Sequence, residues 1–161
     1  MVEKQLSALH GKQRFAAGYW QAMSQENVEL VRRALEEFNR GGPAAVISGG
    51  FLSTEVMLDA SRAEIPGVSA FRGQDEGRAF FEEDWFGAFP FEEWEIHIEE
   101  PIVDHGDQVI FTSRQQGRGA SSGAAAEPAL GNIFTLRNGE IVRMQIFRPP
   151  EEALEAAGLS E

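Results

Sequence analysis

The sequence predicts an α+β fold in which a curved antiparallel sheet wraps around two to three N-terminal helices, with a short helix at the C-terminus. The expected order is a helix, a short helix, a strand, a helix and then four long strands as a meander. Runs of helices followed by runs of strands are typical of α+β proteins with an antiparallel sheet. A long twisted sheet must bury one face, and only the helices expected at 24–40 and 74–88 are available to cover it. Together these elements would form a cone with an open end, which is a natural ligand pocket.

The clearest local signal is a hairpin near the C-terminus. Two apolar runs, Ile133–Leu136 and Ile141–Phe147, flank Asn138-Gly139. Both turn residues tolerate the positive φ of a tight primed turn, so this pair between β-prone runs is a strong hairpin signal. After the hairpin, Pro149-Pro150 precede a short helix.

The helices are placed by their start and stop signals. Ser24 is a good N-cap for the first helix. Gly41-Gly42 are expected to end that helix, and Pro43 can open a second, short one. Asp75 in the first turn of 74–88 is favourable at the positive end of the helix dipole.

The remaining strands follow from alternation and apolar runs. A buried strand is expected at Glu55–Ala60, a half-exposed strand at 93–103, and further long strands at 108–118 and about 127–136. Two segments carry no strand pattern: residues 61–72 are expected to be irregular, and residues 119–126 a flexible hairpin loop.

Composition excludes several classes of function. The formal charge of -12, from 26 acidic and 14 basic residues, argues against nucleic acid and anionic membranes as partners. The chain has no cysteine, which excludes disulfides, thiolate nucleophiles and Cys-ligated metals. No apolar run reaches the ~18 residues of a membrane span, and the three histidines form no metal-ligand pattern. We expect a cytoplasmic protein without metal or organic cofactor.

Residues 1–22 differ from the rest of the chain. They are locally basic in an acidic protein, so we expect an N-terminal extension at 1–22 and one domain at 23–161. Met23 directly precedes the helix cap, which makes it an alternative to Met1 as the native start.

Five segments together resemble the SnoaL-like branch of the nuclear transport factor 2-like superfamily. They are SQENVELVRRALEEFNRGG, FLSTEVMLD, FRGQDEGRAFFEEDW, FTLRNGEIVRMQIF and EEALEAAGL, and they span Ser24 to about Leu159. The resemblance implies a curved antiparallel sheet, helices on its concave side, a conical pocket and a homodimer. It does not choose a function, because the superfamily includes isomerases, cyclases, dehydratases, epoxide hydrolases and pure binding proteins.

Ketosteroid isomerase is the best understood member of the superfamily, with an Asp base and two oxyanion donors. The resemblance puts its base on Asp59 and its acidic donor near Asn132, while the position of its tyrosine falls near Ala34. As a base, Asp59 would need apolar surroundings that raise its pKa; the alternative is a strand-end Asp that caps a turn. Asn132 can polarise a substrate if its face of the strand is concave; otherwise it lies at the outer surface.

The remaining candidates concern the lining of the pocket. We expect aromatic residues and one arginine there, namely Phe81, Trp85, Phe89, Phe134 and Arg114. Arg114 and Gln116 alternate with Ser113 and Gln115, so either pair can face the pocket while the other faces outward. His97 is expected at a solvated or interfacial position rather than a catalytic one, and His105 in a turn beside Gly106.

Two functions follow from these observations. The first is a cofactor-independent enzyme, an isomerase, cyclase or hydrolase, that acts on a small, largely apolar molecule with Asp59 as base and Asn132 as polarising donor. The second is a non-catalytic ligand-binding or interaction module with the same pocket. A base needs a cavity beside it, whereas a structural Asp59 would be exposed or hydrogen-bonded to backbone.

Overall fold

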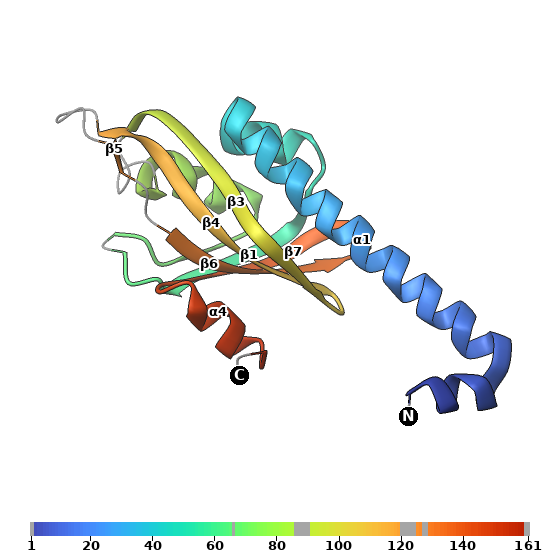
Figure 1. Cartoon of the computed structure of the whole chain (residues 1–161). Coiled ribbons are helices and arrows are strands. Elements are labelled where there is room, and N and C mark those ends of the chain that lie inside the picture. Colours follow the sequence, from blue (N-terminus) through green and yellow to red (C-terminus); the bar gives the residue numbers. More distant parts are fainter. Residues whose placement is uncertain (1, 66, 86–90, 120–124, 127–128, 160–161) are drawn as a thin grey trace.

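The computed structural model describes residues 2–65, 67–85, 91–119, 125–126 and 129–159, with side chains for 25–65, 67–85, 95–116 and 129–159. A long helix lies across a strongly curved sheet, and a short C-terminal helix lies on the other side of that sheet (Figure 1). The expected α+β class and the curved sheet are confirmed.

The sheet is built from the strands β1 (Leu52–Arg62), β2 (Ala70–Arg72), β3 (Phe91–His105), β4 (Gln108–Gly119), β5 (Ala125–Ala126), β6 (Ala129–Arg137) and β7 (Glu140–Phe147). Their order is β2-β1-β7-β6-β4-β3, with β5 paired to β4. The meander of the four long strands β3, β4, β6 and β7 is therefore confirmed. One pair departs from the expected antiparallel arrangement: β1 and β7 pair in parallel, which makes the sheet mixed.

The β6–β7 hairpin turns as the sequence predicts. Asn138 and Gly139 have φ of 53° and 77°, the two consecutive positive values that a tight primed turn requires. The pairing of Arg137 with Glu140 places these two residues alone in the turn.

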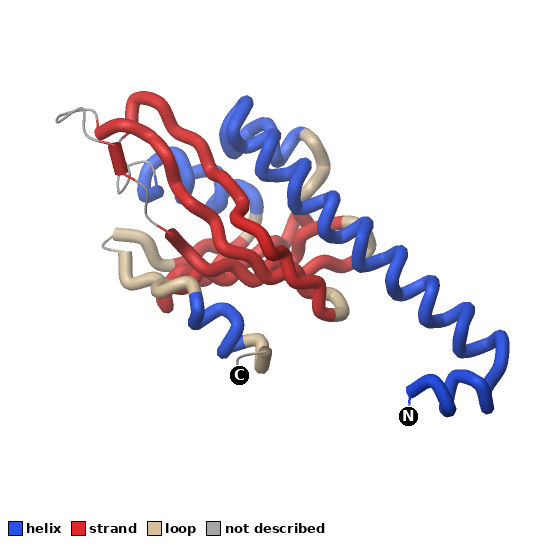
Figure 2. Tube along the Cα trace, in the orientation of Figure 1, coloured by secondary structure: helices blue, strands red, loops and turns tan. Residues whose placement is uncertain are grey.

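Helix α1 (Val2–Ser48) is longer than expected at both ends. It runs through Ser24, which is therefore not its N-cap. It also continues through Gly41 and Gly42, since a glycine inside a helix costs only ~1 kcal/mol. Gly42 has a φ of +72°, and the last turns of α1 bend away from the main axis (Figures 1 and 2). The helix therefore does not end at Gly41-Gly42 as expected but changes direction there, and Pro43 lies in the turns that follow.

The second helical segment changes its winding halfway. α2 (Gln74–Ala79) is an α-helix and η1 (Phe80–Trp85) is a π-helix. The wider turn brings residues five apart toward one side, and both Phe80 and Trp85 are buried. Residues 86–88 of the expected helix lie outside the described residues.

Two segments expected to be irregular contain short strands. Residues 70–72 form β2, which pairs antiparallel with β1, and residues 125–126 form β5 on β4. Both are additions to strands whose positions were expected, so they widen the sheet without altering its order.

The sheet has a core on each face. The larger one lies on the concave face, covered by α1, α2 and η1. The smaller one lies on the other face, where α4 (Glu151–Ala156) packs Ala153 against Ile110, Ile133 and Phe147. The concave core is not completely filled, and the space left within it is the candidate site.

Candidate functional site

A cavity opens between the concave face of the sheet and the helices that cover it. The total empty volume of the cavity, including its open mouth, is about 770 Å³. The centre of a water molecule can reach about 70 Å³ of this volume. At ~10–15 Å³ for each water measured in that way, the enclosed part has room for roughly six waters. A ligand of the size of one substituted aromatic ring therefore fits.

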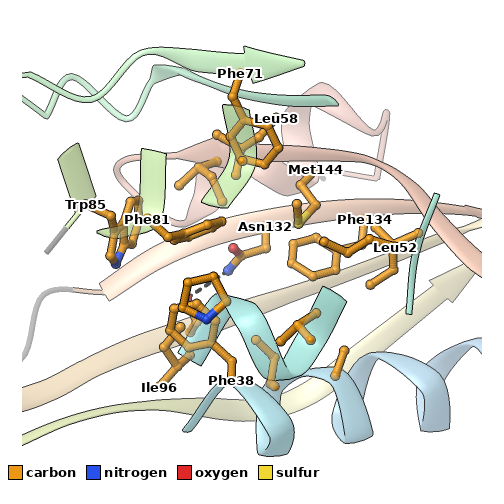
Figure 3. A pocket seen from close by; sticks show the side chains of 18 of the residues that line it. Phe38, Leu52, Leu58, Phe71, Phe81, Trp85, Ile96, Asn132, Phe134 and Met144 are labelled. Atoms are coloured by element: carbon orange, nitrogen blue, oxygen red, sulfur yellow. Dashed lines mark hydrogen bonds between the residues drawn. The ribbon is translucent and has the colours of Figure 1, made fainter. Parts of the chain in front are cut away.

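Aromatic rings line the cavity in two groups, which lie on different sides of it (Figure 3). Phe81 contacts Phe38 with ring centroids 5.2 Å apart, and it contacts Phe71 and Trp85 at 5.8 Å each. Phe134 packs edge-on against Phe111 at 5.0 Å. Three of these four contacts are edge-on and the Phe81–Trp85 contact is tilted, and edge-to-face geometry at such distances is favoured for aromatic pairs.

Three buried polar side chains interrupt this apolar lining, and we refer to Asn132, Ser113 and Gln115 as the buried amide cluster. Their exposed fractions are 4%, 3% and 1%. Asn132 Nδ2 donates to Ser113 Oγ at 2.9 Å, and Gln115 Nε2 donates to the same oxygen at 3.2 Å. Figure 3 shows the Asn132 amide pointing toward the middle of the cavity.

The backbone fixes how Asn132 is turned. Its Nδ2 also lies 3.2 Å from the Leu130 carbonyl oxygen and 3.4 Å from that of Phe111. Exchanging the amide oxygen and nitrogen would set an oxygen against these two acceptors, so the orientation is settled by its partners.

Asp59 lies on the opposite face of the sheet from Asn132. In β7, Ile146 pairs with Asn132 and Gln145 pairs with Asp59. Because successive residues of a strand point to opposite faces, these pairings put Asp59 and Asn132 on different faces. The structure does not bring the two predicted catalytic residues together.

The surroundings of Asp59 are those of a turn-capping carboxylate. The Ser61 hydroxyl donates to its Oδ1 at 2.6 Å and the Ser61 backbone N–H at 2.9 Å. These two hydrogen bonds hold the pKa of Asp59 below its ordinary value, with smaller contributions from Arg143 and Arg62. The expectation of a raised pKa is therefore wrong, because the carboxylate is only partly buried and is well hydrogen-bonded.

The other predicted residues divide between the two faces. Phe81, Trp85 and Phe134 line the cavity. Arg114 points away from it and pairs with Glu99, with 2.5 Å between Nε and Oε1. Phe89 lies outside the described residues.

Residues 31–144 match the SnoaL-like domain family. The chain belongs to this family. No curated protein matches it. The expected resemblance is thus confirmed over most of the chain, and the solved structures agree with it.

Three solved structures illustrate the fold of this SnoaL-like chain. A nuclear transport factor 2-like protein of unknown function from Burkholderia pseudomallei is 19% identical over 81% of this chain and 95% of its own, with a TM-score of 0.62. TerC, co-crystallised with polyporic acid, is 15% identical over 81% and 96%, with 0.61. A putative SnoaL-like polyketide cyclase from Jannaschia sp. CCS1 is 20% identical over 85% and 94%, with 0.58. At these identities the likeness concerns the fold.

The SnoaL-like cavity carries no charge on its described lining. No Asp, Glu, His, Lys, Arg or Tyr side chain lines it within the described residues, and no group of three potential metal ligands gathers there or elsewhere in that part of the chain. His97 and His105 are exposed. None of the described helices is long and apolar enough to cross a bilayer.

Sequence reasoning left open which polar pair of β4 faces inward. The structure turns Ser113 and Gln115 toward the cavity and Arg114 outward. A usable signal was present, because strand alternation puts Ser113 and Gln115 on the same side as Phe111. In a strand of this SnoaL-like sheet, an aromatic residue two positions away indicates the buried face.

Proposed function

We propose that this SnoaL-like protein binds one small, neutral, largely apolar molecule in its cavity and performs no acid/base chemistry there. The observation that supports this is the lining itself, which is apolar except for Gln74 and the buried amide cluster and has no ionisable side chain among the described residues. A charged ligand would lose its hydration without gaining a counter-charge, which is costly in an apolar site.

The other expectation, a cofactor-independent isomerase, cyclase or hydrolase, needs a proton acceptor within hydrogen-bond reach of the substrate. Asp59 lies on the outer face, and its lowered pKa makes it a weaker base than an ordinary carboxylate. Under our proposal Asp59→Asn leaves the affinity for a cavity ligand unchanged. The predicted homodimer stays a prediction and is not needed for the cavity, which one chain forms.

Methyl-detected NMR titration with toluene tests the proposal directly. We expect saturable shifts of the methyl groups that line the cavity, such as Leu58, Met144 and Ile146, and smaller shifts for Ile110 and Ile133 under α4. Uniform or non-saturable shifts would contradict a binding site in the cavity.

A variant that fills the cavity adds a second test. Ala34 lines the cavity and is 3% exposed, so Ala34→Leu should abolish toluene binding by occupying the space. Ala79→Leu is the matched control, because Ala79 is an exposed residue of α2 away from the lining. If the leucine at position 34 prevents folding, Ala34→Val makes the same test with less added volume. Unchanged toluene affinity in a folded variant would refute the proposed site.

A further inference from the structure

We infer that the buried amide cluster selects ligands that carry a hydrogen-bond donor, a hydroxyl or an N–H group, by offering them the Gln115 side-chain oxygen. This inference rests on the proposed function, since it concerns the ligand class of the same cavity. It starts from one atom: Gln115 Oε1 is buried and accepts no hydrogen bond from any described residue.

An unpaired oxygen at this place is unusual. Gln115 is 1% exposed and lines the cavity, and the great majority of buried polar groups in proteins have a hydrogen-bond partner. Leucine or methionine would fill the same position in an apolar cavity without leaving an acceptor unpaired. A ligand that brings a donor to the oxygen would explain why a glutamine stands there.

Both amide nitrogens of the cluster donate to protein acceptors. Asn132 Nδ2 is turned to Ser113 Oγ and to two backbone carbonyls. Gln115 Nε2 is turned to Ser113 Oγ. Asn132 is held in place by backbone, Ser113 is held by Asn132, and Gln115 is held by Ser113. This series of contacts fixes the Gln115 amide with its nitrogen on Ser113 and leaves its oxygen as the unpaired acceptor.

The cluster therefore distinguishes between ligands of one shape. Toluene would leave Gln115 Oε1 unpaired in a cavity now emptied of water, whereas phenol donates its hydroxyl to it. A buried unpaired group is penalised strongly enough that we expect a preference for phenol of about tenfold or more.

Phenol also loses more hydration than toluene, so the quantity to measure is the quotient of the two dissociation constants, Kd(toluene)/Kd(phenol), in the native chain and in a variant. In Gln115→Met, which keeps the length of the side chain and removes the amide, the quotient should fall by about tenfold or more. Gln145→Met is the matched control, because Gln145 lies on the outer face of β7 opposite Asp59, and its quotient should match the native one.

Anisole has an acceptor oxygen but no donor, and it separates the two ways in which the Gln115 amide can be turned. We expect anisole to behave as toluene does. If it instead loses affinity in Gln115→Met as phenol does, the amide nitrogen faces the ligand and the inference is overturned.

The remaining outcomes are also decisive. A quotient that is unchanged in Gln115→Met overturns the inference but leaves the proposed function intact, because both ligands still bind. Failure of all three ligands to bind the native chain overturns the proposed function and the inference together. If Gln115→Met does not fold, Gln115→Leu takes its place with the same expected fall.

Discussion

Gly131 is the point at which β6 touches the C-terminal helix, and Gly131→Ala should loosen that contact. A Cβ atom at this position would lie 2.5 Å from the Pro150 carbonyl oxygen and 2.8 Å from the Ala153 Cβ. Ordinary contacts begin near 3.4 Å, so the backbone at Pro150 would have to move by about 0.9 Å. The nearest atom belongs to backbone, so rotation of a side chain cannot relieve the clash.

The size of the effect follows from what the helix can do. Full undocking of α4 would uncover Ile110, Ile133 and Phe147, each buried to 98% or more, at roughly 1.5–3 kcal/mol for each side chain. A small shift of the helix is cheaper, and overpacking of this kind typically costs about 1–3 kcal/mol. We therefore expect α4 to stay docked and the free energy of unfolding to fall by about 1–3 kcal/mol.

Urea unfolding followed by circular dichroism measures this change, and thermal unfolding should show a lower Tm by roughly 2–4 °C for each kcal/mol in a chain of this size. Ala153→Gly in the Gly131→Ala background removes the Cβ contact but not the contact with Pro150, so it should restore stability only in part; Ala153→Gly alone provides the reference. Native-like stability of Gly131→Ala, or full rescue by the second change, would show that the Pro150 backbone does not set the limit.

Two further predictions concern polar contacts outside the cavity. Asn39 on α1 makes two hydrogen bonds with the backbone of Ile96 of β3: Nδ2 donates to the carbonyl oxygen at 2.8 Å, and Oδ1 accepts from the N–H at 2.7 Å. Asn39→Ala should lower the free energy of unfolding, measured in urea, by about 1–3 kcal/mol. Asn39→Asp, which lacks the donor, should not restore it. Ser61→Ala removes the hydrogen bond that contributes most to the lowered pKa of Asp59, so that pKa should rise toward 3.8 in a ¹³C carboxyl titration. A lowered folded-state pKa stabilises the fold above the unfolded value and loses that contribution as the pH falls through the folded value, so native and Ser61→Ala chains should differ above about pH 4 and converge in stronger acid; an unchanged pKa would contradict this account.

The local parts of the fold were predictable because their signals are local. Asn138-Gly139 specify their turn through their own φ angles, and the alternation of residues 93–103 identifies a half-exposed strand without reference to any partner. The helix limits were less predictable, since the N-cap signal of Ser24 competes with good helix formers on both sides. The π-helix at Phe80–Trp85 is also a tertiary effect, because it serves to bury two aromatic residues in the same core.

The site was less predictable because it depends on register between distant strands. Whether Arg114 or Gln115 faces the helices is a choice between two neighbours in one strand, and the polar residues around them do not decide it. Likewise, the position of Asp59 relative to Asn132 depends on the register of β7, which pairs with β1 in parallel and with β6 antiparallel. The parallel β1–β7 pair joins segments more than 80 residues apart in the sequence, and no local sequence pattern predicts it.

That same register is the strongest physical reason to separate Asp59 from any chemistry in the cavity. To turn Asp59 inward, β1 would have to slip by one residue, and a slip of one residue exchanges the two faces of the whole strand. Val56, Leu58 and Ala60, which are at most 2% exposed, would then face outward. Exposing the first two costs roughly 1.5–3 kcal/mol each, and the bonds from Ser61 to the carboxylate would be lost as well. The packing of Val56, Leu58 and Ala60 thus keeps Asp59 out of the cavity, while β4 and β6 place the amides of Gln115 and Asn132 in its lining. Recognition of a neutral donor group is the role that we propose for this arrangement.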